Sequence, residues 1–458
     1  MQRTMVLLVV GLTGRHLGKH TPRISALAER GKAVPLRTLT PAVTCSVQST
    51  FTTGTMPSDH GCVANGWYFR DDAEVRLWRQ SNALVQGEKI WDAAKARDSR
   101  FSCAKMFWWY NMYSSADWSV TPRPIYRANG RKLPDVYSEP PDLRDTLTAE
   151  LGTFPLFNFW GPRTSVVSSK WIADSARWVY DKRSPALTLV YLPHLDYDLQ
   201  RLGPDDPKIE TALREIDDVA GDLIDRAEHD GTRVIVLSEY GVTKVDGVVH
   251  INRALRRAGL IAFREELGEE HFDAGASEAF AMADHQVAHV YVRRPERIAE
   301  VKALLESLDG VERVLDAAGK VEEGLDHARS GELVAISDAN RWFSYYWWLD
   351  DSKAPDYART VAIHDKPGYD PCELLIDPEI PMAPLHVAKW MLQSKVFNQR
   401  VLLDVIPLDA SLVKGSHGRI TDDPEDGPVF ITSDAGLLEA DSVEATAVKQ
   451  LVLSHLFD

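Results

Sequence analysis

The chain of 458 residues carries 52 lysines and arginines against 67 aspartates and glutamates, which gives a formal net charge of −15. This acidic balance argues against a general nucleic-acid binder, because phosphate backbones require a basic surface. Hydrophobic residues make up 44% of the chain and charged residues 26%, a composition that excludes large-scale disorder. The length allows two to three domains, or one α/β fold with a large sheet and an inserted cap.

The first element that the sequence predicts is a buried parallel strand at Met5–Val10, a continuous apolar run that ends at Gly11. This run is too short for the core of a signal peptide. No window approaches the roughly 18 apolar residues of a membrane span. The four cysteines lie far apart without a CxxC pair, which is typical of reduced thiols in the cytoplasm. We therefore expect a cytoplasmic protein without a membrane span.

Further elements alternate between helix and strand. A helix is expected over 21–31, because Pro22 stands at the first helical position and Gly31 just past the end. Strand-like runs follow at 187–192 and 234–237, with a helical pattern over 209–229 between them. Strands that alternate with helices indicate an α/β protein with a largely parallel central sheet flanked by helices.

A second strand–helix–strand unit lies near the middle of the chain, at 288–292, 295–308 and 311–315. We interpret it as a smaller α+β lobe inserted into the main fold. The expected domains are a main α/β core at 1–245 with an aromatic-rich cover at about 67–171, the inserted lobe at 246–340, and a return to the core at 341–458. The tail from 436 to 458 is expected to form a closing surface helix. The aromatic segments 67–171 and 342–348 either pack into the core or line a pocket for a hydrophobic or ring-bearing group.

Four polar clusters stand where an α/β enzyme gathers catalytic groups, at the carboxyl ends of strands and in loops. The first contains Thr44. A hydroxyl at the start of a helix is a favoured nucleophile, because the helix dipole and free N–H groups stabilise an incoming oxyanion. The simpler interpretation is that Thr44 only caps the helix. The second cluster contains His194, Asp196 and Asp198, which could bind a cation or act as a base. The third is Ser238-Glu239-Tyr240-Gly241, and the fourth is His417 in a glycine-flanked loop.

In this order the clusters resemble the nucleotide pyrophosphatase/phosphodiesterase branch of the alkaline phosphatase superfamily, over most of the chain. The nucleophile motif of that branch is matched in spacing and residue type by Pro41, Thr44, Thr53-Gly54, Pro57, His60-Gly61 and Asn65-Gly66. The resemblance implies that Thr44 attacks phosphorus and forms a phosphothreonine intermediate that water then releases.

The same resemblance implies two zinc ions, held by an Asp/Asp/His set and an Asp/His/His set, and here the chain departs from the pattern. Val10 stands at the place of the first-strand aspartate, Gln200 at that of a histidine, and Glu239-Tyr240 at that of an Asp-His pair. We expect a depleted site with one divalent ion, zinc by resemblance, or none at all. Its expected ligands are Asp196, Gln200, Glu239 and His417.

Further residues are candidates for the same site. Asp284, His285 and His289 form either a relocated ligand set or a hydrogen-bonded structural cluster. Tyr240 is expected to donate a hydrogen bond to a phosphoryl oxygen or to Thr44. Expected substrate contacts also include Gln48, and the loop residues His364 and Lys366, whose charge would offset a phosphate; the alternative is a solvated loop.

Three functions are compatible with these motifs. The first is a phosphodiesterase or nucleotide pyrophosphatase with Thr44 as nucleophile. The second is a hydrolase of phosphomonoesters, phosphonates or sulfate esters on the same site. The third is a degenerate relative that only binds a phosphorylated ligand. A small phosphorylated molecule is the expected partner in each case, and nothing in the sequence indicates the natural substrate or an oligomeric state.

Overall fold

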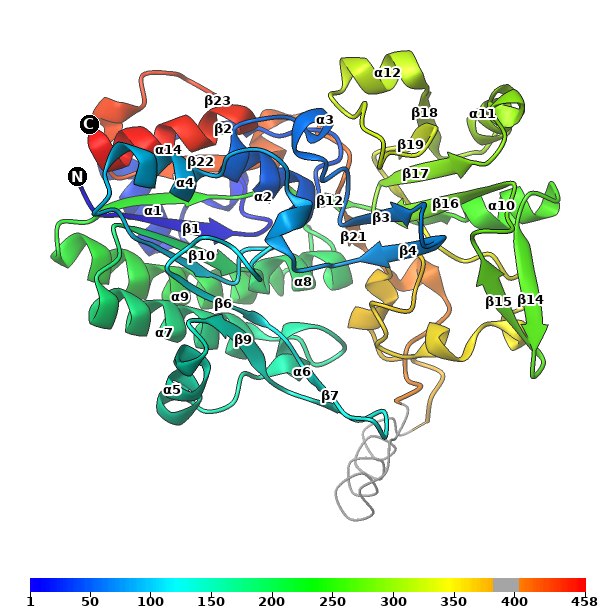
Figure 1. Ribbon diagram of the computed structural model, residues 1–458, viewed down its shortest axis with the longest axis horizontal. Helices are drawn as coiled ribbons and strands as arrows, with labels where there is room; N and C mark the ends of the chain where they lie inside the picture. Colours follow the sequence, from blue (N-terminus) through cyan, green and yellow to red (C-terminus); the bar gives the residue numbers. More distant parts are fainter. Residues whose placement is uncertain (382–402) are drawn as a thin grey trace.

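The computed structural model describes residues 1–381 and 403–458 and is built around a nine-stranded sheet (Figure 1). The strand order is β23-β2-β22-β11-β1-β10-β5-β6-β9, and the run from β11 to β6 is parallel. The strands are β1 (Thr4–Val9), β2 (Lys32–Arg37), β5 (Cys103–Met106), β6 (Trp118–Pro122), β9 (Val136–Glu139), β10 (Leu187–Leu192), β11 (Arg233–Leu237), β22 (Val429–Thr432) and β23 (Val443–Glu444). The expected α/β fold with a mostly parallel sheet is confirmed.

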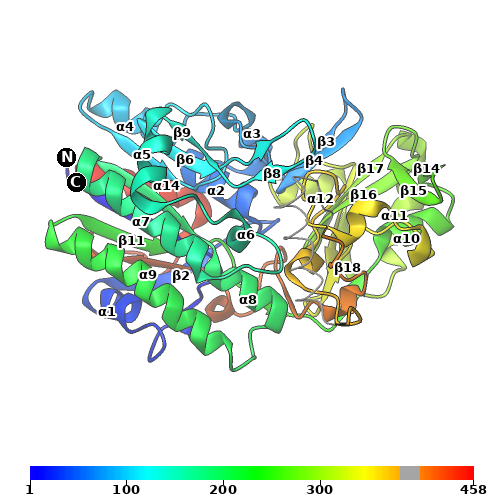
Figure 2. The same ribbon diagram turned by 90° about the horizontal axis from the view of Figure 1, so that it is seen from below.

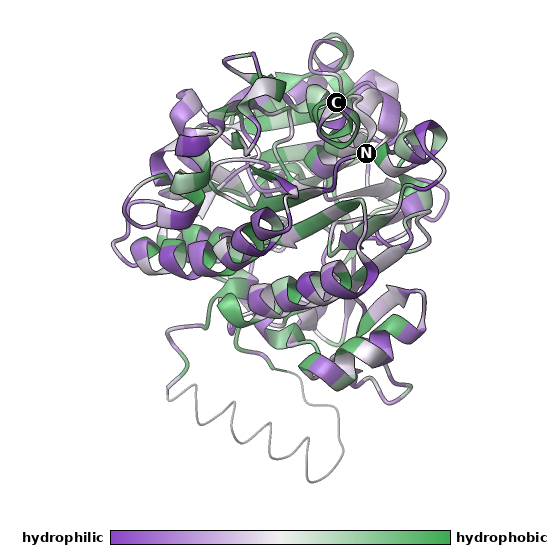
Figure 3. Cartoon of the chain, turned by 90° about the vertical axis from the view of Figure 1, so that its left-hand side faces the viewer, coloured by the Kyte–Doolittle hydropathy of each residue, from purple (hydrophilic) through white to green (hydrophobic). Residues whose placement is uncertain are grey.

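Helices cover both faces of this sheet. One face carries α1 (Pro22–Arg30), α5 (Asp142–Leu151), α7 (Val166–Arg183), α8 (His194–Leu202) and α9 (Ile209–His229), as Figure 2 shows. The other carries α2 (Thr44–Thr53), α4 (Ile90–Arg97) and α14 (Val448–Phe457). Every residue of β1 and β10 is buried, as expected for strands covered on both faces. Apolar residues concentrate on the interior strands and hydrophilic ones on the outer sides of the helices (Figure 3).

A second lobe contains a four-stranded sheet with the order β16-β17-β19-β18. Its elements are α10 (Ile251–Arg257), β16 (Ala279–Asp284), β17 (Val287–Val292), α11 (Ile298–Glu306), β18 (Val311–Leu315), α12 (Ala317–Glu322) and β19 (Leu333–Ser337). Since β17 and β18 both pair antiparallel with β19, they run parallel to each other with α11 between them in sequence. The strand–helix–strand unit expected from the sequence lies here.

The lobe takes in more of the chain than the expected 246–340. Its hydrophobic core continues into residues 342–380 and 405–413 and includes Ala64 and Leu77. Further strand pairs are β3 (Gly66–Phe69) with β4 (Glu74–Leu77), β7 (Ile125–Tyr126) with β8 (Lys132–Leu133), β12 (Thr243–Lys244) with β21 (Gly415–Ser416), β13 (Gly247–Val249) with β20 (Arg341–Phe343), and β14 (Ala262–Glu266) with β15 (Glu269–Asp273). The short helices are α3 (Pro57–His60) and α6 (Leu156–Phe159).

The aromatic segment 342–348 belongs to the core of the second lobe. Its rings are at most 1% exposed, and none lines the large cavity between the two lobes. The hypothesis that this segment lines a substrate pocket is therefore wrong, because the rings pack against one another and against the lobe's sheet. The segment 67–171 divides: Phe107 and Trp108 lie in the main core, whereas Trp78 and Trp109 face a cavity.

The two termini lie at the same end of the molecule, where Gln2 N donates to the Leu456 carbonyl (Figure 1). The closing helix α14 begins at Val448, later than expected, because residues 435–447 form two single turns and β23. The cysteines Cys45, Cys62, Cys103 and Cys372 are buried and unbonded. Among the described residues, no helix has the length and apolar character needed to cross a membrane.

Candidate active site

Thr44 lies at the edge of the central sheet where the carboxyl ends of β1, β2, β10 and β11 meet. It is the first residue of α2, and Val43 precedes it in extended conformation as the N-cap. Thr44 therefore does not cap the helix, which was the simpler interpretation of the sequence. Its side chain is buried, yet it opens into a cavity of about 1910 Å³ between the two lobes. This volume exceeds the roughly 300–1,000 Å³ of ordinary ligand pockets.

The hydroxyl of Thr44 is held by a short chain of hydrogen bonds. Its Oγ1 lies 3.3 Å from the Tyr240 hydroxyl, which in turn lies 3.4 Å from Asp196 Oδ1. The other carboxylate oxygen, Oδ2, accepts from Gln200 Nε2 at 2.7 Å. Asp196 and Gln200 are four residues apart on α8, so they share one face of the helix. Burial raises the pKa of Asp196 to about 7, and the Gln200 and Tyr240 hydrogen bonds oppose this shift.

Glu239 lies behind Thr44, away from the cavity surface. Gln48, one turn along α2 from Thr44, donates its amide to Glu239 Oε1 at 2.6 Å. The amide oxygen of Gln48 accepts from the backbone N–H of Trp109 at 2.8 Å. Burial raises the pKa of Glu239 to about 8, with Gln48 and Thr44 partly opposing the shift. Gln48 thus positions Glu239 and Trp109 and does not itself line the cavity.

Four rings stack beside Thr44 and form what we call the ring column: Tyr240, His417, His285 and Tyr369. Successive ring centroids lie 3.5, 3.6 and 3.7 Å apart. His417 follows β21, whereas His285 sits at the tip of the β16–β17 hairpin with φ of +61°. The column thus joins the first lobe to the second.

The imidazole of His417 is fixed by its neighbours. Its Nδ1 lies 2.9 Å from the Ala42 carbonyl, so Nδ1 carries the proton. Nε2 then points its lone pair toward Asp196, whose Oδ1 is 3.9 Å away. Burial lowers the pKa of His417 to about 3, which keeps the ring neutral. Tyr369 completes the arrangement by donating its hydroxyl to Gln200 Oε1 at 2.9 Å.

Asp284 and His289 have structural partners. Asp284 accepts from the backbone and side-chain amides of Asn65 at 2.8 and 3.0 Å, and Asn65 Oδ1 accepts from Cys45 N in the first turn of α2. His289 Nε2 lies 3.0 Å from the Val63 carbonyl. These contacts match the structural alternative, and of the three candidates only His285 lines the cavity. The hairpin turn separates His285 from the strand that holds His289, so the two rings do not converge.

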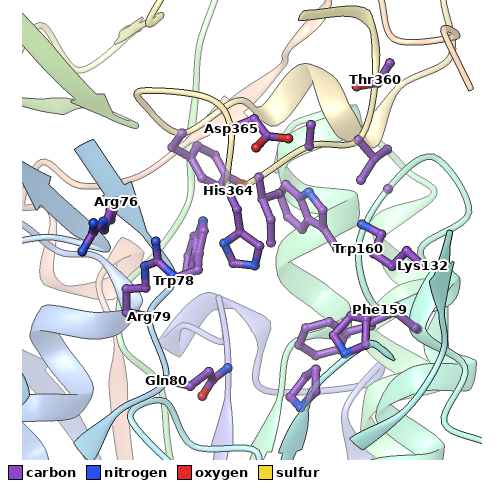
Figure 4. Close-up of a pocket in the computed structure, with 18 of the residues that line it drawn as sticks. Arg76, Trp78, Arg79, Gln80, Lys132, Phe159, Trp160, Thr360, His364 and Asp365 are labelled. Atoms are coloured by element: carbon purple, nitrogen blue, oxygen red, sulfur yellow. The ribbon is translucent and has the colours of Figure 1, made fainter. Parts of the chain in front are cut away.

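The two loop candidates also differ. His364 lines the cavity (Figure 4). Lys366 does not: it is 1% exposed and pairs with Asp370 and Glu373 at 2.8 Å each. These two carboxylates neutralise the charge of Lys366 inside the second lobe, so its position does not support the predicted contact with substrate.

Comparison with known proteins places the chain in a family. Residues 4–370 match the type I phosphodiesterase/nucleotide pyrophosphatase family. The chain belongs to this family. A curated relative, an uncharacterised pyrophosphatase/phosphodiesterase of Schizosaccharomyces pombe, is 26% identical over 235 residues, which span 48% of this chain and 41% of the relative.

Two solved structures share the fold of this family member. Phosphonoacetate hydrolase from Sinorhizobium meliloti, in complex with phosphonoformate, is 13% identical with a TM-score of 0.63, over 99% of this chain and 96% of that one. An inactive threonine-to-alanine variant of murine ectonucleotide pyrophosphatase/phosphodiesterase 5, in complex with AMP, is 14% identical with a TM-score of 0.59, over 100% and 95% of the two chains.

The donors in this family member do not fit the pair of zinc ions that the resemblance implied. Val10 has no donor atom, and its side chain is buried in the core. Gln48 donates an N–H group to Glu239, and Gln200 donates one to Asp196. These hydrogen bonds occupy carboxylate oxygens that a cation would need. Throughout residues 1–381 and 403–458, no group of three or more His, Cys, Asp or Glu side chains converges as a metal site. Hydrogen-bond donors instead occupy both carboxylate oxygens of Asp196 and one of Glu239, whereas Glu239 Oε2 has no partner among the described residues.

Several cavity residues were not anticipated. Tyr369 lies in the same loop as His364, yet no pattern distinguishes it from a surface tyrosine. Trp109 and Trp108 are adjacent in an aromatic run, and only the backbone turn sends one to the cavity and the other to the core. Cations such as Arg79 and Lys132 also line the cavity. Arg79 lies in a loop and Lys132 in the short strand β8, and neither belongs to a motif.

Proposed function

We propose that this family member hydrolyses phosphoric ester or diphosphate bonds with Thr44 as the nucleophile. The observation that carries the proposal is the position of Thr44, the first helical residue of α2, with its hydroxyl open to the cavity and 3.3 Å from Tyr240. A helix start supplies unpaired N–H groups and a partial positive charge, which stabilise the charge that develops on phosphoryl oxygens.

The first step forms a bond from Thr44 Oγ to phosphorus while the bond from phosphorus to the leaving oxygen breaks. The leaving oxygen keeps the bonding electron pair and departs as an anion that takes up a proton from the solvent. As Thr44 attacks, its proton passes to the Tyr240 hydroxyl, and Tyr240 passes its own proton to Asp196. Burial raises the pKa of Tyr240 well above its usual range, so the phenol stays protonated between these transfers. Hydrogen bonds of 3.3 and 3.4 Å are long, but such contacts commonly shorten when substrate binds.

In the second step water attacks the phosphothreonine. Asp196 returns its proton through Tyr240 to the departing Thr44 oxygen, and the proton released by water leaves with the inorganic or monoester product. The inactive threonine-to-alanine variant among the related structures supports this role for a threonine. The likeness to phosphonoacetate hydrolase supports tests on phosphonates as well as on phosphoesters.

The proposal is tested with Thr44→Val, which keeps the shape and removes the hydroxyl, and with Thr44→Ser, which keeps the hydroxyl. Turnover of bis-p-nitrophenyl phosphate, p-nitrophenyl phosphate, phosphonoacetate and p-nitrophenyl sulfate would be measured for each. We expect Thr44→Val to lose activity and Thr44→Ser to retain part of it. Acid quench and peptide mass spectrometry should find a phosphoryl group on Thr44. Thr53→Val, which removes a hydroxyl from the far end of the same helix, is the matched control.

The missing zinc donors favour a second candidate, a protein that binds a phosphorylated ligand without cleaving it. In that case the wild type would bind AMP in a calorimeter and turn over none of the four substrates. Wild-type turnover that persists in Thr44→Val would refute the nucleophile. The cytoplasmic location stays a prediction.

A further inference from the structure

We propose that the outer end of the cavity binds a second oxyanion, carried by the same substrate whose phosphorus Thr44 attacks. The site consists of Arg79, Arg123 and Lys132, with His364 beside them; we call these four residues the outer basic cluster. The substrate is then a phosphoester in which a ring-bearing or apolar segment separates the scissile phosphorus from a phosphate or carboxylate. The inference rests on the proposed function for the role of Thr44.

The cluster gathers residues from separate parts of the chain. Arg79 follows β4, Arg123 stands between β6 and β7, Lys132 lies in β8, and His364 belongs to a loop of the second lobe. All four line the cavity. In Figure 4, Arg79 and Lys132 stand on opposite sides of the space with His364 between them. Burial lowers the pKa of His364, and the charges of Arg79 and Lys132 both lower it further, which agrees with their placement around this ring.

The three cations have no ion-pair partner among the described residues. Within the described residues Arg79, Arg123 and Lys132 form no ion pair, whereas neighbouring Arg76 pairs with Asp72 and Glu74. Partial burial lowers the pKa of Arg79, and the like charges of Arg76 and Arg123 add to the effect. Burial also lowers the pKa of Lys132. Solvent screens part of this repulsion, because Arg79 and Arg123 are exposed, and a bound anion would offset what remains.

The carboxylates near the cluster do not supply that neutralisation. Glu74 attracts Arg79 but pairs with Arg76. Glu373 attracts Lys132 from a distance, but its close contacts go elsewhere, to Lys366, the Trp160 indole N–H and the Ala362 N–H. The charge of Asp365 opposes the effect of burial on the pKa of Lys132 and of His364, and Asp365 makes no ion pair in the described part of the chain. Three cations therefore face one available carboxylate. Guanidinium groups bind planar oxyanions through paired N–H donors, so a phosphate or carboxylate fits this excess charge.

A continuous aromatic wall connects the cluster to Thr44. The ring column runs from Tyr240, beside Thr44, to Tyr369. Tyr369 contacts Trp78 and Trp160 at centroid distances of 6.0 and 5.6 Å. Trp78 directly precedes Arg79 in sequence. A substrate that reaches both ends of the cavity must lie along these rings, which explains why its middle segment should be apolar or carry a ring.

Two matched substrate pairs test the proposal by measuring kcat/KM. The first pair is thymidine 5′-(p-nitrophenyl phosphate) with and without a 3′-phosphate. The second is p-nitrophenyl phenyl phosphate with and without a para-carboxylate on the phenyl ring. We expect the member with the extra oxyanion to be preferred by about tenfold, the size of a charge-assisted hydrogen-bond pair. A response in only one pair identifies the oxyanion as phosphate or as carboxylate.

Variants assign that preference to the cluster. Arg79→Gln and Arg123→Gln, both at exposed positions, should each reduce the preference, and the double variant should abolish it. Arg100→Gln removes an exposed arginine outside the cavity that pairs with Asp98, and it should leave the preference intact. The proposal is overturned by a wild type without preference, or by a preference that survives in the double variant.

A binding experiment separates this proposal from the proposed function. Thymidine 5′-phosphate and thymidine 3′,5′-bisphosphate are titrated into Thr44→Val by calorimetry. If no substrate is turned over but the bisphosphate binds about tenfold tighter in an Arg79-dependent manner, the hydrolase proposal fails and the oxyanion site stands. If both ligands bind equally while hydrolysis proceeds through Thr44, the oxyanion site fails and the hydrolase stands.

Discussion

The two ends of the cavity satisfy their polar groups in opposite ways. At the inner end, the buried side chains of Asp196, Gln200 and Tyr240 bond to one another and to Thr44 or Tyr369. At the outer end, Arg79 and Lys132 form no ion pair within the part of the chain that the structure describes. Preorganised groups suit chemistry on one fixed phosphorus, because they need no rearrangement as charge develops. Charges without an ion-pair partner suit ligand recognition, because the ligand can supply the opposite charge.

The largest effect should come from the inner end. In Tyr240→Phe the path for the Thr44 proton is broken while the ring still stacks on His417. We expect kcat to fall by about a hundredfold or more, the usual contribution of a positioned proton-transfer group. Steady-state rates on bis-p-nitrophenyl phosphate would measure this. Tyr180→Phe, whose hydroxyl bonds to Thr232 far from the cavity, is the control and should keep wild-type rates. Equal rates in the two variants would contradict the role of Tyr240.

A second prediction concerns the buried ions behind the outer end. Lys366→Met leaves Asp370 and Glu373 unpaired at 2% and 0% exposure. We expect the free energy of unfolding to fall by about 3–5 kcal/mol, as for other buried pairs that lose one partner. Urea denaturation would measure the change. Lys353→Met, which removes an exposed lysine paired with Glu265, should change the stability little. If the triple variant with Asp370→Asn and Glu373→Gln does not recover stability, unpaired charge is not the cause.

The third prediction concerns the support of the aromatic wall. Lys105 in β5 donates to the Tyr110 carbonyl and so holds the turn that carries Trp109. Burial lowers the pKa of Lys105 to about 7, whereas the unfolded chain has its ordinary value of 10.5. Between these values the unfolded state binds more protons, so rising pH stabilises the fold, by at most about 1.4 kcal/mol per pH unit.

The measurement is the difference in unfolding free energy between wild type and Lys105→Met across this pH window. The difference should shift in favour of wild type as pH rises and should be flat below pH 7. Lys95→Met, at an exposed site, should give no such trend. A constant difference for Lys105→Met would mean that this lysine keeps an ordinary pKa in the fold.

The smallest effect is expected from chelation. Because Gln200 and Tyr240 occupy both oxygens of Asp196 and Gln48 occupies one oxygen of Glu239, dialysis against EDTA should leave the rate of phosphoester cleavage unchanged. Gln200→His would complete a three-ligand set with Asp196 and His417, and this variant should bind zinc where the wild type does not. Elemental analysis of both proteins measures this directly. Rate loss on chelation, restored by zinc in the wild type, would contradict the prediction.

Much of the fold followed from local signals. The apolar runs of β1, β10 and β11 and the Pro22 start of α1 depend only on neighbouring residues, and the structure confirms them. The extent of the second lobe could not be predicted from such local signals. Residues 344–381 and 403–413 fold into the lobe as loops and single turns, which have no periodicity that a sequence pattern can show.

The part of the candidate site that the topology of the central sheet determines could be predicted from the sequence. Thr44, Asp196 and Tyr240 come together because the carboxyl ends of parallel strands meet at one edge, and the pairing of β21 with β12 brings His417 to the same edge. Lys366 could not be placed from its residue type, because a lysine in a loop may face either a ligand or, as here, two buried carboxylates of its own loop. The catalytic role of Thr44 stays a prediction until the variants are measured.

The ring column also constrains how product leaves. His417 and His285 stack across the junction of the two lobes, and the His417 carbonyl accepts from Gln286 N at the hairpin tip. The lobes cannot hinge apart without unstacking the rings that hold Tyr240 beside Thr44. Arg79 and Lys132 line the same cavity as Thr44, so a charged substrate or product moves within reach of the outer basic cluster. Added salt or competing anions should then act on the rates of entry and departure, and leave the chemical step to the inner end.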